Sequence, residues 1–193
     1  MNEKSIYILL TDTGTWFSKM IKFYTRFPYN HISIALDEGL DNLYSFGRRV
    51  YRNPFSGGFV KERMDQGVFF HQKETKCVLY KMTVNEEQYN QILRVIYQFE
   101  SFAANYKYNL LGIFAIAVNL RLKRDNAYTC SQFVATVLNM SGFELLSKCP
   151  ELMRPDDFLE IPSLELIYEG KLHEYHSYFS ELASFGVRNA ISV

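Results

Sequence analysis

The sequence predicts an α+β fold in which a small antiparallel sheet packs against a helix that begins at Cys130. Strand-like segments of alternating hydrophobicity dominate the first half of the chain, and helical patterns stand at both ends of this region. The two patterns do not alternate regularly, as they would in a parallel α/β sheet. No repeat or linker-like segment interrupts the 193 residues, so we expect one domain over residues 1–193.

The first fifty residues predict three strands and one helix. A strand is expected over residues 5–10, followed by a helix that ends before Pro28. The next strand begins at His31, because apolar residues alternate with smaller or more polar ones from there. Turn-forming residues 38–42 then lead into a strand over residues 43–49. The apolar face of the helix would consist of Trp16, Met20, Ile21 and Tyr24.

In the middle of the chain, some segments show a clear secondary-structure pattern and others do not. Residues 52–58 contain Asn-Pro and Gly-Gly pairs and predict a loop, whereas residues 59–72 show no clear pattern. Residues 76–84 alternate as a strand does, and Asn85 with Gln88 three residues later predicts a capped helix. The apolar face of that helix would consist of Tyr89, Ile92, Leu93, Ile96 and Phe99.

The longest apolar run extends from Leu110 to Leu120 and is too short to cross a bilayer. We expect a buried helix here. The alternative is a membrane-facing lip, because Arg121, Lys123 and Arg124 follow directly and could meet lipid headgroups.

The last third predicts the cysteine helix, a loop and a final strand. Apolar residues follow Cys130 at helical spacing, and Gly142 would end that helix. Residues 150–162 are loop-like, and residues 164–168 predict a strand.

Composition limits the classes of function. The chain is 48% hydrophobic and 16% aromatic, which excludes disorder, and its formal net charge of zero gives no general attraction to nucleic acid. The three cysteines, Cys77, Cys130 and Cys149, fit neither a disulfide framework nor a C-x-x-C metal site. With no signal peptide visible, they lead us to expect a reducing, cytoplasmic location and at least one free thiol.

Cys130 and His31 are the strongest candidates for chemistry. Cys130 is expected at a helix N-terminus, where unpaired N–H groups and the helix dipole favour the nucleophilic thiolate. A strand histidine that faces such a thiol would complete the nucleophile and base of a cysteine hydrolase or acyltransferase. The alternative is that the cysteine is a small buried apolar residue and the histidine is merely packed.

A third residue usually orients the base of such a pair. Ser45 is the candidate, because antiparallel pairing of its strand with the His31 strand would bring the two residues close. Asp37 and Asp41 are alternatives, although both flank a turn in which aspartate is expected without any function.

Other site residues follow from the same reasoning. The backbone N–H of Cys130 is the expected oxyanion donor, and the hydroxyl of Tyr128 could line the site as a substrate-binding group. His173 and His176 are three residues apart but have no clear third ligand. We therefore expect no metal ion and no other cofactor.

At these residues the chain resembles the circularly permuted NlpC-type papain-like proteins, in particular the YiiX-like branch. The resemblance covers roughly residues 5–50 and 105–142, and in that group the histidine precedes the cysteine, as it does here. The lecithin:retinol acyltransferase-like enzymes of the same superfamily share this order. The similarity is carried by residues 11–14, Ser18, Ile21, Thr25, and residues 29–36, 129–134 and 155–159.

The resemblance implies a permuted papain-like fold, with Cys130 as nucleophile and His31 as general base and acid. The third residue of the superfamily is often a histidine, glutamate or glutamine on the following strand, where this chain has Ser45. We expect an enzyme that cleaves or transfers an amide or ester through an acyl-enzyme. Its substrate would be a small molecule, a peptide or a lipid. Two alternatives stay open: a binding module with little or no activity, indicated by Ser45, and a membrane-associated lipid acyltransferase, indicated by residues 110–120.

Overall fold

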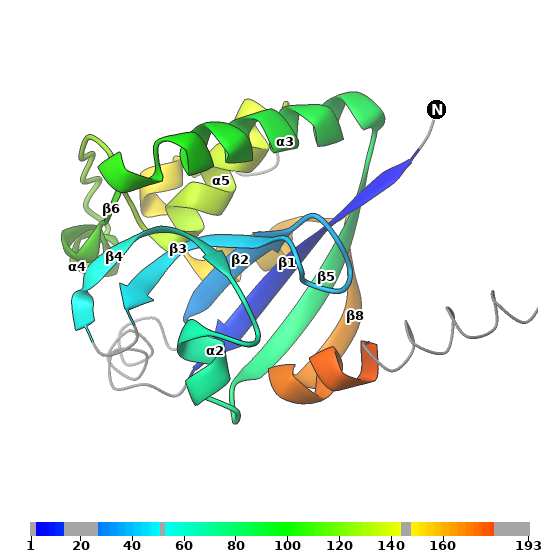
Figure 1. Ribbon diagram of the computed structural model, residues 1–193. Coiled ribbons are helices and arrows are strands. Elements are labelled where there is room, and N and C mark those ends of the chain that lie inside the picture. The colour runs from blue at the N-terminus through cyan, green and yellow to red at the C-terminus, as the bar shows by residue number, and fades with distance from the viewer. Residues whose placement is uncertain (1–2, 14–26, 51–52, 144–147, 180–193) are drawn as a thin grey trace, which may run out of the picture.

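The centre of the molecule is a six-stranded antiparallel sheet with the strand order β4-β3-β2-β1-β5-β8 (Figure 1). The structure is a computed structural model that describes residues 3–13, 27–50, 53–143 and 148–179. An α+β fold is therefore confirmed. The strands are β1 (Lys4–Asp12), β2 (His31–Ala35), β3 (Leu43–Val50), β4 (Asn53–Glu62), β5 (Lys76–Val84) and β8 (Leu164–Lys171).

Helices cover both faces of the sheet. The helices α3 (Glu86–Ser101) and α5 (Cys130–Met140) lie on one face, and α2 (Gly67–His71) and the helical residues 172–179 lie on the other (Figure 1). The remaining elements are short. They are η1 (Ala103–Asn105), β6 (Lys107–Tyr108), α4 (Leu110–Ala117), β7 (Ala127–Tyr128), η2 (Pro150–Leu152) and η3 (Pro155–Glu160), and β6 pairs with β7 in parallel.

Strand β1 shows how the sheet separates two cores. Successive side chains of a strand point to opposite faces, and in β1 both sets are buried. Ile6, Ile8 and Leu10 belong to the core that α3 and α5 cover. Tyr7 and Leu9 belong to the core under α2 and residues 172–179. The helix that carries Cys130 therefore lies directly on the central strands.

Most of the expected elements are present. The predicted strands over residues 5–10, 43–49, 76–84 and 164–168 correspond to β1, β3, β5 and β8, and the strand that begins at His31 is β2. The Asn85 side chain accepts from Gln88 N at 2.8 Å, and Gln88 Oε1 accepts from Asn85 N at 3.1 Å, which confirms the capping box of α3. The helix expected before Pro28 lies outside the described residues.

The loop predicted over residues 52–58 is wrong, because Asn53–Glu62 form β4. The glycines that suggested a loop serve close packing instead. A Cβ atom on Gly57 would lie 2.6 Å from Tyr108 Cβ, and one on Gly58 would lie 2.5 Å from the Tyr106 carbonyl oxygen. The two glycines therefore let residues 106–108 lie directly against an extended strand.

The helix expected over residues 110–120 is present, but the prediction that it is buried is wrong. The helix α4 forms, with Asn109 as its N-cap, but only Gly112 and Ala115 are buried within it. Large apolar side chains of this segment remain exposed instead. Within the described residues, no helix has the length and apolar character needed to cross a membrane.

Candidate active site

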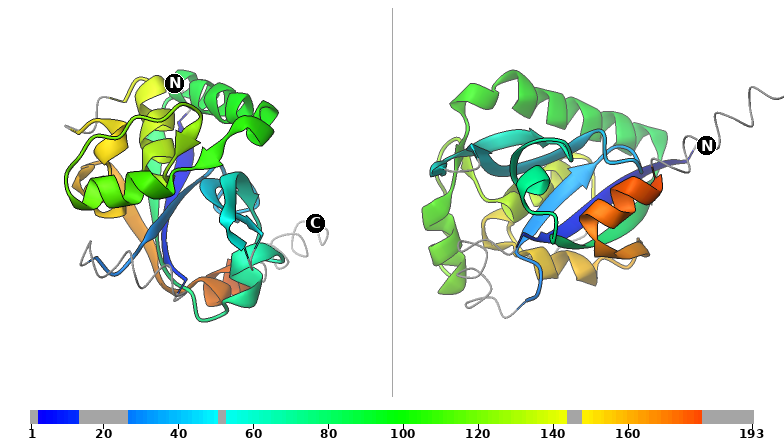
Figure 2. Two further views of the ribbon diagram at one scale, coloured as in Figure 1. Left: turned by 90° about the vertical axis from the view of Figure 1, so that its left-hand side faces the viewer. Right: turned by 60° about the horizontal axis from the view of Figure 1, so that its bottom comes forward.

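The site lies where the sheet opens between β2 and β3. Strand β2 pairs with β1 over residues 31–35 but with β3 only at Ile34 and Ala35. The β3–β4 hairpin curves away from β1 and β2 (Figure 2, left). The Leu36 N–H donates to Asn42 O on the β3 side, and alternate residues of a strand face the same neighbour. The N–H of Ile32 therefore points into this opening.

Cys130 fills the opening from the N-terminus of α5. Thr129 caps the helix through a hydrogen bond from Gln132 N at 3.1 Å, so Cys130 occupies the first helical position, as the sequence predicts. The Cys130 sulfur accepts hydrogen bonds from the backbone N–H groups of Ile32 and Ser131. Two elements distant in sequence thus direct N–H dipoles at one sulfur atom, which favours its thiolate form.

His31 contacts the same sulfur. The two side chains are hydrogen-bonded to each other. The backbone before His31 is anchored, because Asn30 N donates to Thr11 O at 3.0 Å and Asn30 Nδ2 donates to Asp12 Oδ1 at 3.0 Å. The predicted nucleophile and base are therefore brought together in the structure.

Glu62, at the end of β4, holds the imidazole from its other side. His31 Nε2 lies 2.9 Å from Glu62 Oε1, and both side chains are largely buried, at 15% and 13% exposure. Ser33 Oγ donates to Glu62 Oε2 and lies 3.3 Å from His31 Nε2. Because Glu62 occupies Nε2, Nδ1 is the ring nitrogen left to face the Cys130 sulfur.

The electrostatics of this group favour a charge-separated pair. Burial alone would lower the pKa of His31. The Glu62 carboxylate and the Cys130 sulfur outweigh this effect and raise the pKa to about 10. Burial raises the pKa of Cys130, but the hydrogen bond and charge of His31 and the two backbone N–H groups bring it below its ordinary value. Both shifts stabilise the thiolate together with the imidazolium.

The structure does not pair Ser45 with His31, and this expectation needs correction. The Ser45 hydroxyl is fully buried and has no hydrogen-bond partner within the described part of the chain. The sheet register explains why. Ser45 pairs with Val60 of β4, whereas β2 and β3 separate before this point, so the position on Nε2 falls to Glu62. Asp37, one of the two aspartate alternatives, accepts from the backbone N–H groups of Asn42 and of Asp41, the second alternative, within the turn.

A tyrosine that the sequence did not indicate contacts the thiol. The hydroxyl of Tyr108 is hydrogen-bonded to Cys130, and burial and the negative charge of the thiolate raise the pKa of Tyr108 well above its ordinary value. The hydroxyl therefore stays protonated and serves as a donor.

Tyr128 pairs with Tyr108 in the short parallel sheet, but its ring lies in an aromatic cluster. The ring centroid of Tyr128 is 5.1 Å from that of Phe46 and 5.2 Å from that of Phe99. Its substrate-binding role stays a prediction, whereas the tyrosine in contact with the Cys130 thiol is Tyr108.

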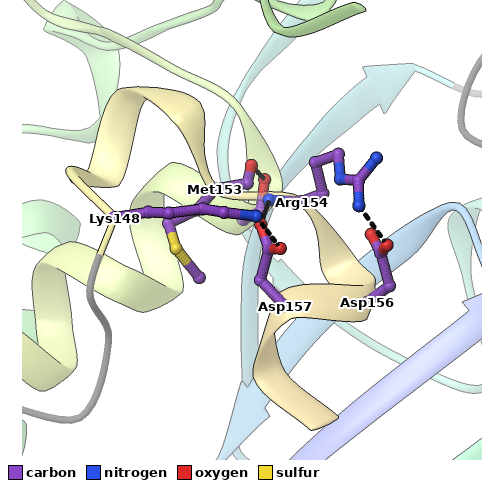
Figure 3. Close-up of polar contacts among 6 residues, drawn as sticks. Lys148, Met153, Arg154, Asp156 and Asp157 are labelled. Carbon is purple, nitrogen blue, oxygen red and sulfur yellow. Dashed lines mark hydrogen bonds and ion pairs between the residues drawn. The ribbon is translucent and has the colours of Figure 1, made fainter. Parts of the chain in front are cut away.

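A polar cluster after α5 supports the start of this helix. Ser131, next to Cys130, donates its hydroxyl hydrogen bond to Met153 O. Lys148 and Arg154 point toward Asp157 and Asp156 respectively, and both form ion pairs there (Figure 3). Asp157 also accepts from Arg154 N at 2.8 Å and is almost fully buried, so the turn that holds Met153 is firmly fixed.

The other candidate residues lie outside this site. Cys77 is buried in β5, and burial raises its pKa to about 12. Cys149 is a free thiol next to η2. Within the described residues, no three or more His, Cys, Asp or Glu side chains gather in a metal-binding arrangement.

Comparison with known proteins adds no assignment. No protein-family model matches the chain, and no curated protein matches its sequence. The geometry around Cys130 is therefore the basis for any function assigned to this chain.

Proposed function

We propose that this protein is a cysteine hydrolase or acyltransferase that acts on an amide or ester bond through an acyl-enzyme on Cys130. One observation carries the proposal: Cys130 is hydrogen-bonded to His31, whose Nε2 is held by Glu62 at 2.9 Å. A nucleophile, a base and a group that orients the base are the three parts that activated-nucleophile chemistry requires.

The reaction would begin with attack of the Cys130 thiolate on the carbonyl carbon of the substrate. A carbon–sulfur bond forms and the carbonyl oxygen takes the negative charge. The His31 imidazolium then donates its proton to the leaving nitrogen or oxygen as the old bond breaks. In the second half, neutral His31 takes a proton from water or an amine, which attacks the thioester carbon. The carbon–sulfur bond then breaks, the acyl product leaves, and the Cys130 thiolate and the His31 imidazolium are restored.

The oxyanion would be stabilised by donors around the sulfur. The Tyr108 hydroxyl contacts Cys130 and is held in its protonated form, which suits it to this task. The backbone N–H of Cys130, at the start of α5, is a second donor. Removing one such donor from an acyl-transfer enzyme costs roughly 10²–10³-fold in rate.

The permuted papain-like fold is part of the same proposal. The chain has the order histidine strand, then cysteine helix, and the strand follows β1 directly in the described sheet. The alternative of an inactive binding module depended on Ser45 as the third residue. Glu62 supplies the carboxylate that Ser45 lacks, which favours the enzyme.

The test is activity profiling of the purified chain against amide, ester and thioester substrates, with mass spectrometry of the intact protein. We expect a mass increase equal to the acyl group, located on Cys130 and absent in Cys130→Ala. Cys77→Ala is the matched control and should retain both activity and the adduct. Turnover that persists in Cys130→Ala, or an adduct on another residue, would overturn the proposal.

A further inference from the structure

The helix α4 presents an apolar surface that no described element covers. Gly112 and Ala115 are buried, Leu110, Ile113 and Ile116 are half-buried, and the other large side chains face outward. The C-terminus of the helix is folded back, with Asn119 at φ 54° and Leu120 N donating to Ala115 O at 2.8 Å, which keeps Leu120 next to the helix. The exposed apolar residues, with 48% to 74% of their surface accessible, are Leu111, Phe114, Val118 and Leu120.

These residues form one continuous surface. Leu111, Phe114 and Val118 are separated by three and four positions, which places them on one side of the helix. Figure 1 places α4 at the periphery, beside β6 and far from the β5–β8 edge of the sheet. Clusters of this kind on a folded domain indicate a contact with a partner or a membrane.

The charges around α4 decide between these partners. Residues 101–124 contain four basic residues and no acidic one, although the whole chain has 21 of each. The basic residues are Lys107, Arg121, Lys123 and Arg124, and all four are exposed. Arg121 pairs with Glu151 of η2 and Asp125 follows Arg124, so Lys107, Lys123 and Arg124 supply the positive charge beside α4. An apolar helix face beside these exposed basic side chains is complementary to an anionic bilayer, with its acyl boundary and its negative headgroups.

We infer that α4 docks on the surface of an anionic lipid bilayer, with Leu111, Phe114, Val118 and Leu120 inserted below the headgroups. Lys123 and Arg124 would then contact lipid phosphates. The helix would lie in the plane of the interface.

The position of α4 connects this surface with the thiol. Tyr108, whose hydroxyl contacts Cys130, is followed directly by Asn109, the residue that caps α4 by accepting from Gly112 N at 3.0 Å. Docking would therefore turn this side of the Cys130 site toward the bilayer. Docking itself does not depend on the proposed function.

The test is co-sedimentation of the full chain with vesicles of phosphatidylcholine alone and of phosphatidylcholine mixed with phosphatidylserine. We expect binding to the mixed vesicles, weaker binding in high salt, and little binding to phosphatidylcholine alone. Phe114→Asp should weaken binding by roughly tenfold or more, as expected for the loss of one buried aromatic side chain. Lys123→Glu should weaken it as well.

Two controls make the result specific. Tyr97→Asp changes an equally exposed aromatic residue on α3 and should bind as the wild type does. Cys130→Ala should also bind normally, so that loss of activity and loss of docking are separable. The inference is overturned if the wild type binds no vesicle, or if Tyr97→Asp and Phe114→Asp behave alike. It is equally overturned if Phe114→Asp only converts a dimer into a monomer, since α4 would then be an interface between copies.

Discussion

His31 Nε2 and Glu62 Oε1 are 2.9 Å apart, although β2 and β4 are separated in the sheet by β3. Glu62 pairs with Leu43, which in turn pairs with Ala35, so the end of β4 stands in the row where β3 still pairs with β2. Glu62 is in turn held by the Ser33 hydroxyl. This arrangement fixes which ring nitrogen faces the thiol and raises the pKa of the histidine.

The first prediction concerns the charge of Glu62. Glu62→Gln keeps a hydrogen-bond acceptor for Nε2 but removes the negative charge that raises the pKa of His31 to about 10. The imidazolium should then lose its proton at lower pH, so the alkaline limb of the kcat/KM profile should move toward neutrality. We expect a rate loss of about 10²-fold, smaller than the ~10⁴-fold that follows when the carboxylate of a Ser-His-Asp triad is neutralised.

The measurement is a pH–rate profile of both proteins with the same substrate. Glu165→Gln, which changes an exposed carboxylate on β8, is the matched control and should leave the profile unchanged. An unaltered alkaline limb in Glu62→Gln would show that Glu62 does not set the charge of His31.

The second prediction separates the two serines near the histidine. Ser33→Ala removes the hydroxyl that holds Glu62, so we expect a loss of activity together with a downward shift of the alkaline limb. Ser45→Ala should leave activity unchanged and stabilise the fold by about 1 kcal/mol, because it removes a buried hydroxyl that has no partner among the described residues. Thermal unfolding and kinetics of the two variants, measured side by side, check this; a larger loss of activity in Ser45→Ala would contradict it.

Local patterns in the sequence were sufficient for the elements that carry the pair. Alternation identifies β2, and the polar residues before Cys130 with the apolar spacing after it identify the start of α5. The capping box of α5, in which Thr129 accepts from Gln132 N, is local chemistry of the same kind. Caps and hydrophobic periodicity involve only residues that are close in sequence, so they can be recognised from one amino-acid sequence.

Glu62 and Tyr108 depend on tertiary packing, which local patterns do not encode. Glu62 follows a glycine-rich segment that favours a loop by composition, and only its pairing with β3 makes that segment a strand. Tyr108 reaches the thiol because Gly57 has no Cβ to obstruct it. The signal available was the Gly-Gly pair, since adjacent glycines in a strand indicate close approach of another backbone.

The third prediction concerns the reactivity of the cysteines. The Cys130 thiol has a lowered pKa because of His31 and two backbone N–H groups, whereas burial raises the pKa of Cys77 to about 12. Iodoacetamide at neutral pH should therefore label Cys130 and leave Cys77 unmodified in the folded protein. His31→Ala should move the labelling of Cys130 to higher pH. Mass mapping of the modified peptides gives the result, and faster labelling of Cys77 or Cys149 than of Cys130 would refute the assignment of the nucleophile.

The last prediction compares two tyrosines that pair with each other in the short parallel sheet. The Tyr108 hydroxyl is hydrogen-bonded to Cys130, whereas the Tyr128 ring packs on Phe46 and Phe99. Tyr108→Phe should therefore lower kcat by roughly 10²-fold, the effect of removing one oxyanion donor, while KM changes little. Tyr128→Phe keeps the packed ring and should retain nearly full activity.

The distinction lies in the hydroxyl groups alone, because both variants keep an aromatic ring of the same shape. Gly57→Ala tests the Tyr108 hydroxyl independently. Its methyl group would come within 2.6 Å of Tyr108 Cβ and displace the tyrosine from the thiol. It should reproduce the kcat loss of Tyr108→Phe, and the double variant should lose no more than either single one. If Tyr128→Phe instead proves to be the damaging substitution, the hydroxyl that serves the substrate is that of Tyr128, and the donor assigned to Tyr108 is wrong.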